Sequence, residues 1–276
     1  MENSFCTAAQ KTFFETFGYL HLPGLMKADI GWIIEDYEAV WSSRPDIVHG
    51  AKGRQTSFPA TFVLETPRLS TLIEDPRIEP LLNLLLGDTW TLNGGDGSLY
   101  DGDTQWHSDI ALWEDESLVR NVKVAFYLDP LTRETGALRV IPGSHLFGDR
   151  YCAQLSTNFN DMKHNLGIDG SQVPAVALEC QPGDVVMFDH RLKHASFGGG
   201  KRRRLMNLNV MESIHNEAQK EAMRNLFRFY RDTHDVKWEF DKKKVDAMPP
   251  ERMRHFAMTL EIGKEVMSEK QTASVH

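Results

Sequence analysis

The sequence holds two potential metal ligands, His107 and Asp109, at a spacing that lets them bind one ion together. On an extended segment, residues i and i+2 point to the same side, so the imidazole and the carboxylate can reach a common point. His194, at the end of the segment GDVVMFDHRLKH, is a candidate for the third ligand. Two histidines and one carboxylate on one face of an octahedral ion are typical of non-haem iron(II) sites, which keep positions open for a co-substrate and O2.

Each of these residues also has a simpler interpretation. A single histidine such as His107 or His194 is more often an ordinary hydrogen-bonded side chain, and an HxD triplet arises by chance in many proteins. The combination of the triplet with a distal histidine is what predicts a metal site. Zinc is disfavoured, because it prefers a closed tetrahedral ligand set, often with cysteine, and no cysteine lies near either half of the motif.

The composition of the 276-residue chain excludes several classes of protein. Its net charge of −8 argues against a general nucleic-acid binder, although residues 201–204 form a local basic run. No apolar run approaches the roughly 20 residues of a membrane helix, and the first residues do not resemble a secretory signal. Cys6, Cys152 and Cys180 show no CxxC spacing and are interpreted as thiols of a reducing compartment. We therefore expect a cytoplasmic protein that binds neither nucleic acid nor membranes.

The elements that must position the candidate ligands fall into three parts, which we interpret as one domain over residues 1–276. Residues 1–88 are mostly helical in pattern, residues 89–212 form a strand-rich core, and residues 213–267 are helical again. In the first part, helices are predicted over 8–20, 27–43 and 67–86, a short strand and turn over 20–26, and loops over 44–66. The apolar pattern of the third helix is interrupted by Pro76 and Pro80.

The strand-rich core carries all the candidate ligands. Its strands are predicted in the segments TWTLNGG, GSLYDGDTQWHSD, NVKVAFYLDP, GALRVIPGS, AVALECQPGDVVMFDHRLKHASF and RRLMNLNVM. Their spacing of about a dozen residues indicates a β-sandwich or barrel. After the core, amphipathic segments at 216–234 and 250–267 predict helices that form a packing layer or the surface of a homodimer. The predicted fold class is therefore mainly β with flanking helices.

The motifs of the core resemble, as a set, those of the phytanoyl-CoA dioxygenase family. They run from QWHSD through YLDPLTRETGALRVIPGSH to PGDVVMFDHRLKHAS, and the resemblance extends over about residues 10–212, including the early element GYLHLPGL. It implies a double-stranded β-helix, a cupin-like jelly roll, over residues 89–212. It also implies a dioxygenase that uses Fe(II), O2 and 2-oxoglutarate as co-substrate, and couples oxidation of a small-molecule substrate to decarboxylation of 2-oxoglutarate to succinate and CO2.

The resemblance implies roles for individual residues of the core. The three candidate ligands match the iron ligands of the family, and Ser196 matches a hydroxyl residue that contacts 2-oxoglutarate. Some members also contact 2-oxoglutarate through a tryptophan on the strand before the LD pair, where this chain has Ala125. Lys123 shares a side of that strand with Ala125 and is therefore the candidate replacement.

The family also binds the far carboxylate of 2-oxoglutarate with an arginine that follows the distal histidine. Here Arg202, Arg203 and Arg204 follow His194 after a loop that is shorter than usual in the family. The apolar residues of RRLMNLNVM alternate, which turns Arg203 to the opposite side, the one that the family directs toward the cofactor. We therefore favour Arg203 as the 2-oxoglutarate ligand, with Arg204 as the alternative. An arginine suits this role because its planar fork binds a carboxylate through two hydrogen bonds.

The substrate is less well defined than the cofactor. Halogenases of this superfamily replace the iron-binding carboxylate with a small residue, so the presence of Asp109 favours hydroxylation or a related oxidation. The acidic triplet Glu114, Asp115 and Glu116 can attract a cationic substrate, or it is a solvated acidic turn. We expect the substrate to be a small free metabolite.

Two other classes of function remain open at this point. A metal-dependent isomerase or hydrolase of the cupin type usually clusters more histidine and glutamate ligands, and this chain has no HxH near His107. A jelly-roll binding protein without turnover is the other alternative. Intact candidates for all three ligands and for the arginine count against it.

Overall fold

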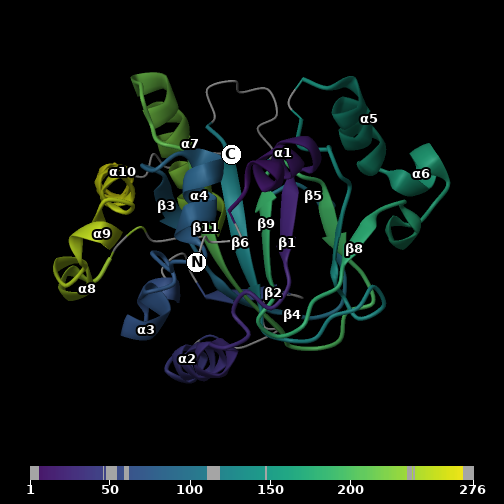
Figure 1. The fold of residues 1–276 in the computed structure, drawn as a ribbon. Coiled ribbons are helices and arrows are strands. Elements are labelled where there is room, and N and C mark those ends of the chain that lie inside the picture. Colours follow the sequence, from purple (N-terminus) through teal and green to yellow (C-terminus); the bar gives the residue numbers. More distant parts are fainter. Residues whose placement is uncertain are drawn as a thin grey trace.

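Two antiparallel sheets lie face to face at the centre of the computed structural model (Figure 1). The structure describes residues 6–45, 47, 55–58, 62–110, 119–146, 148–234, 238 and 240–269. The larger sheet contains β1 (Tyr19–Leu22), β2 (Gln55–Phe58), β3 (Thr91–Gly94), β4 (Gly97–Tyr100), β6 (Asn121–Tyr127), β9 (Val185–Asp189) and β11 (Arg203–Met211). Their order is β1–β9–β6–β11–β4–β2, and β3 pairs with β11 beside this path. The smaller sheet contains β5 (Thr104–His107), β7 (Leu138–Val140), β8 (Val176–Leu178) and β10 (His194–Ser196), in the order β5–β10–β7–β8.

The central strands of the larger sheet have two different faces, because successive side chains of a strand point to opposite sides. On β6, Val124 and Phe126 belong to the core beneath the N-terminal helices. Their neighbours Ala125 and Tyr127 belong instead to the apolar cluster between the two sheets, which also contains Val140 of the smaller sheet. The inner face of β6 therefore lines the interior of the sandwich.

Strand β11 alternates in the same way. Its fully buried residues on the helical side are Met206, Leu208 and Val210. Leu205 packs on the inner side, and Arg203 lines the cavity between the sheets. The prediction that Arg203 and the apolar residues of this strand lie on opposite sides is confirmed.

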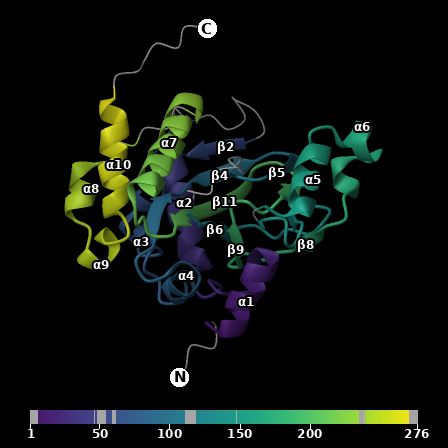
Figure 2. The same cartoon turned by 90° about the horizontal axis from the view of Figure 1, so that it is seen from above.

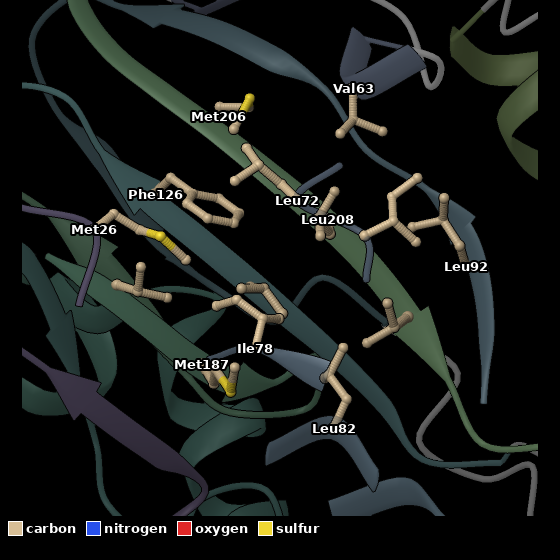
Figure 3. Close-up of a cluster of buried hydrophobic side chains, with 14 of the residues drawn as sticks. Met26, Val63, Leu72, Ile78, Leu82, Leu92, Phe126, Met187, Met206 and Leu208 are labelled. Atoms are coloured by element: carbon tan, nitrogen blue, oxygen red, sulfur yellow. The ribbon is translucent and has the colours of Figure 1, made fainter. Parts of the chain in front are cut away.

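The largest hydrophobic core lies between the larger sheet and the N-terminal helical segments. Figure 3 shows Phe126, Met187 and Leu208 of the sheet beside Ile78 and Leu82 of the helical layer. Full burial of one such side chain stabilises the fold by about 1.5–3 kcal/mol. This layer therefore fixes the outer face of the sheet and leaves the inner face for polar residues.

The N-terminal helical segments are α1 (Ala8–Phe17), α2 (Ile30–Ser42), the 3-10 turn η1 (Phe62–Leu64), α3 (Pro67–Ser70) and α4 (Glu79–Leu86). Helix α1 ends at Gly18, whose φ of 84° is in the left-handed region that favours glycine. The predicted third helix is divided into α3 and α4, as its prolines indicated. Pro76 lies between the two helices, and Pro80 lies in the first turn of α4, where its missing N–H breaks no helical hydrogen bond. Within the predicted loop region 44–66, the described residues include β2 and η1.

Further helices flank the sheets on two opposite sides (Figures 1 and 2). One group contains α5 (Arg150–Phe159), α6 (Met162–Leu166) and the 3-10 turn η2 (Gly170–Gln172); the other contains α7 (Glu217–His234), α8 (Lys242–Asp246), α9 (Pro250–Met253) and α10 (Ala257–Ser268). No helix was predicted at α5 or α6, although Leu155, Phe159 and Met162 recur there at helical spacing. In the structure, these three residues pack against Trp106 and Phe197. The predicted helix at 250–267 is divided into α9 and α10. The core is thus a jelly roll, and the helices around it make the whole structure mixed α and β.

Helices α7 and α10 pack against each other and form the predicted packing layer. Ion pairs join them along their length: Arg224 Nε lies 2.7 Å from Glu265 Oε2, and Arg228 Nη2 lies 2.7 Å from Glu269 Oε1. An apolar cluster supports the contact through Met223, Phe227, Ile262 and Val266. A homodimer through these helices stays a prediction.

The packing of the outer face predicts the effect of truncating a side chain there. Replacing the fully buried Leu208 with alanine is expected to lower the free energy of unfolding by about 2–5 kcal/mol, because transfer energy and packing are both lost. Urea denaturation measures this loss. The matched control is Leu166→Ala at the exposed end of α6, which is expected to change stability by about 0.5 kcal/mol or less. Equal losses at both positions would contradict the assignment of Leu208 to the core.

Candidate metal centre and cofactor cavity

All seven site residues predicted from the sequence line one cavity between the two sheets. They are His107, Asp109, Lys123, His194, Ser196, Arg203 and Arg204. They come from four strands, β5, β6, β10 and β11, and from the turn after β5. The cavity therefore joins segments that are far apart in the sequence and belong to different sheets.

The two histidines are direct partners across neighbouring strands. His107 ends β5 and His194 begins β10, and the two residues face each other in the antiparallel register, with ring centroids 4.1 Å apart. The Nδ1 atom of His107 lies 2.7 Å from the carbonyl oxygen of Gln105, and that of His194 lies 2.9 Å from the carbonyl oxygen of Leu192. A carbonyl can only accept, so each Nδ1 donates its N–H, and Nε2 is the nitrogen left on each ring to bind a metal.

Asp109 completes a three-donor group. Its Oδ1 lies 3.8 Å from Nε2 of His107 and 3.7 Å from Nε2 of His194. Its backbone N–H donates to the carbonyl oxygen of His190, at 2.9 Å, which fixes the turn after β5. The three ligand atoms lie within 4.8 Å of one another, so they can bind a single ion. The side-chain convergence predicted from the HxD spacing and the distal histidine is thus present.

Lys123 gives the carboxylate of Asp109 a second partner. Its Nζ lies 2.9 Å from Oδ2, so that the ammonium and the two imidazoles approach different oxygens of the same carboxylate. Burial favours the neutral acid, but Lys123 and the nearby histidines outweigh it and hold the pKa of Asp109 well below its usual range. The pKa of Lys123 is raised: burial opposes its charge, and Asp109 and Asp96 more than compensate. Asp109 is therefore ionised and oriented.

The imidazole of His194 is kept neutral by its surroundings. Burial, together with the neighbouring imidazole of His107, lowers its pKa to about 3 despite the opposing effect of Asp109. Phe188 packs beside the ring, with centroids 4.9 Å apart. A neutral imidazole is the form that binds a metal ion, so this histidine needs no deprotonation at neutral pH.

Arg203 reaches into the same cavity from β11. Its Nη1 donates to the carbonyl oxygen of Gly136 at 2.9 Å, and its Nη2 donates to that of Gly102. Its Nε is buried without a hydrogen-bond partner, and the side chain forms no ion pair with any residue in the described ranges. A Cβ at Gly136 or Gly199 would lie within about 2.5 Å of the guanidinium, so a larger residue at either position would displace the arginine side chain. Arg203 is therefore a half-buried cation held by neutral carbonyls.

The neighbouring arginines are already paired. Arg204 Nε lies 3.1 Å from Asp129 Oδ1 and its Nη1 lies 3.1 Å from Glu38 Oε1. The pKa of Arg204 is raised, mainly by the hydrogen bonds to Asp129. Arg202 Nη2 lies 2.8 Å from Glu38 Oε2 and is half exposed. Among the three arginines, only Arg203 meets no carboxylate within the described part of the chain.

Sequence reasoning missed several polar residues of the cavity. Gln55, Asp96, Tyr100 and Thr104 line it beside the predicted residues. Tyr100 follows the alternation of β4 into the interior, where burial raises its pKa to about 12. The pleat of GSLYDGDTQW could have indicated that face, whereas nothing in the sequence pointed to Asp96 in the turn before β4. The acidic triplet 114–116, expected beside the substrate, lies outside the described residues.

The chain is similar to several known proteins. A family model described as phytanoyl-CoA dioxygenase matches residues 14–205. The ectoine dioxygenase of Sphingopyxis alaskensis is 25% identical over 225 residues, which is 70% of this chain and 71% of that protein. Among solved structures, the alpha-ketoglutarate-dependent carbocyclase SnoK from nogalamycin biosynthesis has a TM-score of 0.60 and 21% identity, covering 75% of this chain and 84% of that chain. EctD from S. alaskensis, in its apoform, has a TM-score of 0.58 and 22% identity, covering 77% of this chain and 79% of that chain.

The fold and the family match define the class of protein as a non-haem iron(II)- and 2-oxoglutarate-dependent dioxygenase, which uses O2. The matched region spans more than half of the chain, so the protein belongs to the phytanoyl-CoA dioxygenase family. The predicted jelly roll, family and cofactors are thus confirmed. In the described ranges, no helix has the length and apolar character needed to span a membrane.

The buried ion pair between Lys123 and Asp109 predicts a large coupling in the protein without metal. Lys123→Met leaves the carboxylate buried without its cation and is expected to cost about 3–5 kcal/mol of unfolding free energy. In the Asp109→Asn background, the same Lys123→Met change is expected to cost much less, because the charge that it strands is gone. Urea denaturation of the four proteins of this double-mutant cycle, in the presence of a chelator, measures the coupling. Additive losses would show that the two groups do not interact in solution.

Proposed function

We propose that His107, Asp109 and His194 hold the catalytic iron(II). The observation that carries this proposal is the convergence of two imidazoles and one carboxylate in a cavity between the sheets. Two nitrogen donors and one oxygen donor, with no sulfur, suit iron(II) and leave coordination positions for the co-substrate. The family to which the chain belongs supports the same assignment.

The residues of the chain orient and stabilise what this cavity binds. When bound, iron(II) and 2-oxoglutarate supply the oxidising chemistry with O2, in which 2-oxoglutarate yields succinate and CO2 and the substrate is oxidised. The backbone carbonyls at Nδ1 of the two histidines aim both Nε2 atoms at the shared point. Lys123 holds Oδ2 of Asp109 and leaves Oδ1 toward that point. Lys123 and Ser196 also stay predicted contacts of 2-oxoglutarate, since both line the cavity.

Arg203 is proposed as the ligand of the far carboxylate of 2-oxoglutarate. Backbone carbonyls accept hydrogen bonds from its Nη1 and Nη2 without neutralising its charge. Its buried Nε has no hydrogen-bond partner. An incoming carboxylate supplies both the missing charge and the missing acceptor. Arg204 is the weaker alternative, because the carboxylate of 2-oxoglutarate would have to compete there with Asp129 and Glu38.

The reaction proposed for this cavity is hydroxylation, or a related oxidation, of a small free metabolite. The retained carboxylate Asp109 favours hydroxylation over halogenation, which needs that coordination position for a halide. A relative named ectoine dioxygenase supports a small-molecule substrate. The described lining also offers polar groups for substrate recognition besides the proposed iron and 2-oxoglutarate contacts, among them Asp96, Tyr100 and Gln55.

Removal of one proposed iron ligand is expected to abolish turnover and to weaken iron binding. His194→Ala and His107→Ala each delete one of three protein donors. Anaerobic titration with iron(II) and 2-oxoglutarate is the measurement, because bidentate 2-oxoglutarate on iron(II) gives a weak visible charge-transfer band. The wild type should develop this band and both variants should not. His164→Ala on the exposed helix α6 is the control and should keep it. A normal band in either ligand variant would remove that histidine from the site.

Removal of the correct arginine is expected to weaken 2-oxoglutarate binding without changing iron binding. A buried carboxylate that loses its charged partner typically costs about 2–5 kcal/mol. Since about 1.4 kcal/mol corresponds to a factor of ten, the Kd of 2-oxoglutarate in Arg203→Ala should rise at least tens of fold. Arg203→Lys should restore part of the affinity, because a point charge lacks the planar fork.

The adjacent arginines provide matched controls for this measurement. Arg202→Ala should leave the Kd of 2-oxoglutarate near the wild-type value, because its guanidinium pairs with Glu38 at a half-exposed position. A large rise in Arg204→Ala with none in Arg203→Ala would move the assignment by one residue. An unchanged Kd in all three variants would contradict an arginine anchor in this segment.

A further inference from the structure

A second group of metal-ligating side chains lies outside the cavity. His21 is on β1, Asp184 directly precedes β9, and Cys180 lies in the turn between β8 and β9. Their ligand atoms lie within 4.8 Å of one another, the same limit that the proposed iron ligands meet. None of the three lines the cofactor cavity. The sequence predicts Cys180 only as a thiol of a reducing compartment, since no CxxC spacing marks it, and its neighbours in space come from distant segments.

The spacing of these atoms also suits a shared cation, although the Cys180 thiol lies within sulfur hydrogen-bonding distance of His21 Nε2 and donates to the carbonyl oxygen of Leu178 at 3.4 Å. The Nε2 atom of His21 lies 3.7 Å from Oδ2 of Asp184 and 3.7 Å from Sγ of Cys180. The first distance is too long for an N–H···O hydrogen bond, which spans about 2.7–3.2 Å. Two ligand atoms bound about 2.0–2.3 Å from one tetrahedral ion lie about 3.3–3.7 Å apart. The proposed iron ligands show the same separations, 3.7 and 3.8 Å.

The backbone holds the carboxylate of Asp184 in place. Asp184 accepts the N–H of Gly24 on Oδ1, at 2.6 Å, and that of Gln181 on Oδ2, at 2.7 Å. These bonds orient the carboxylate toward His21 and still leave it lone pairs. Asp184 and Cys180 are more than nine-tenths buried, whereas the His21 side chain is one-quarter exposed and gives access from solvent. The group thus combines two buried donors with one that solvent can reach.

A nucleophilic role for Cys180 does not fit this arrangement. In a cysteine–histidine–carboxylate triad, the thiol and the carboxylate engage different nitrogens of the imidazole. Here both approach the same Nε2 of His21, so the imidazole cannot relay a proton between them. Burial also raises the pKa of the Cys180 thiol to about 12, which disfavours a free thiolate.

We propose that His21, Cys180 and Asp184 form a second metal site, for a borderline divalent cation such as zinc(II). Imidazole, thiolate and carboxylate are the ligands that zinc(II) takes, and a sulfur donor distinguishes this site from the sulfur-free iron centre. On binding, the S–H bond of Cys180 breaks, the metal–sulfur bond forms and the proton passes to the solvent. Water completes the coordination on the exposed side of His21. The bound ion would join β1 to the turn before β9, across a separation of 159 residues.

Cobalt(II) is the probe that separates the two sites. Only a cobalt ion bound by sulfur gives an intense thiolate charge-transfer band in the near ultraviolet. In the otherwise intact protein carrying His194→Ala, which damages the proposed iron centre, we expect one equivalent of cobalt(II) to produce this band and zinc(II) to displace it. Cys180→Ser should abolish the band. Cys152→Ser is the matched control, since that buried thiol contacts the carbonyl of Gly143, and should retain it.

A gentler variant keeps the test decisive if Cys180→Ser fails to fold. His21→Gln changes a partly exposed side chain and should raise the cobalt(II) concentration needed to form the band at least tenfold. Circular dichroism should show that this protein is still folded. Zinc(II) should raise the Tm of the His194→Ala protein but not that of the protein that also carries His21→Gln. The absence of a thiolate band, or a band that persists in both the Cys180 and His21 variants, would overturn this second site. Either result would leave the proposed iron centre untouched.

Discussion

The alternation of side chains along β6, β9 and β11 is the constraint on which the rest of the structure depends. In the central parts of these strands, alternate residues are apolar and pack beneath the N-terminal helices, which directs their neighbours into the space between the sheets. A shift of one residue would exchange the two faces and carry Lys123 and Arg203 into the apolar core. Such burial of an unpaired charge is costly, so the register that forms the core also positions the site.

Charge pairing then decides what each polar residue of the interior can bind. Asp109 is balanced by Lys123, and Arg204 by Asp129 and Glu38. Arg203 is different, because carbonyl groups satisfy part of its hydrogen bonding and leave its positive charge uncompensated. An interior that holds such a cation favours entry of an anion of matching shape. Charge pairing, which stabilises the polar residues of the interior, therefore also defines where a dicarboxylate can be anchored.

The sequence was sufficient to predict the features that depend on the spacing of nearby residues or on the alternation of side chains along a strand. The HxD spacing brings His107 and Asp109 together at the end of β5, and the pleat of β11 separates Arg203 from the apolar residues on the helical side. The pairing of Lys123 with Asp109 could not be predicted, because β5 and β6 belong to different sheets and no spacing rule relates residues across a sandwich. Lys123 was accordingly predicted only as a 2-oxoglutarate contact, and its ion pair emerged from the structure.

The same limitation explains the elements and residues that the sequence did not indicate. Helices α5 and α6 are short and largely polar, so their few apolar residues, packed on Trp106, form a weak periodic signal. The group of His21, Cys180 and Asp184 has no sequence motif, because its donors come from β1 and from two points of one turn. Such a group becomes visible only when the sheet order places β1 beside β9.

The two clusters of donors differ in chemistry in a way that bears on metal selection. Zinc(II) generally binds a given set of nitrogen and oxygen ligands more tightly than iron(II) does, so a site with two imidazoles and one carboxylate does not exclude zinc(II) by affinity. Geometry must contribute: the three donors converge in a cavity that Arg203 and Ser196 also line, which suits an ion that also binds a chelating co-substrate. The proposed second site offers zinc(II) a thiolate instead. A chain with both sites would bind each metal where its preferred donors are, and the jelly roll would then use one ion for catalysis and the other to secure its edge strand.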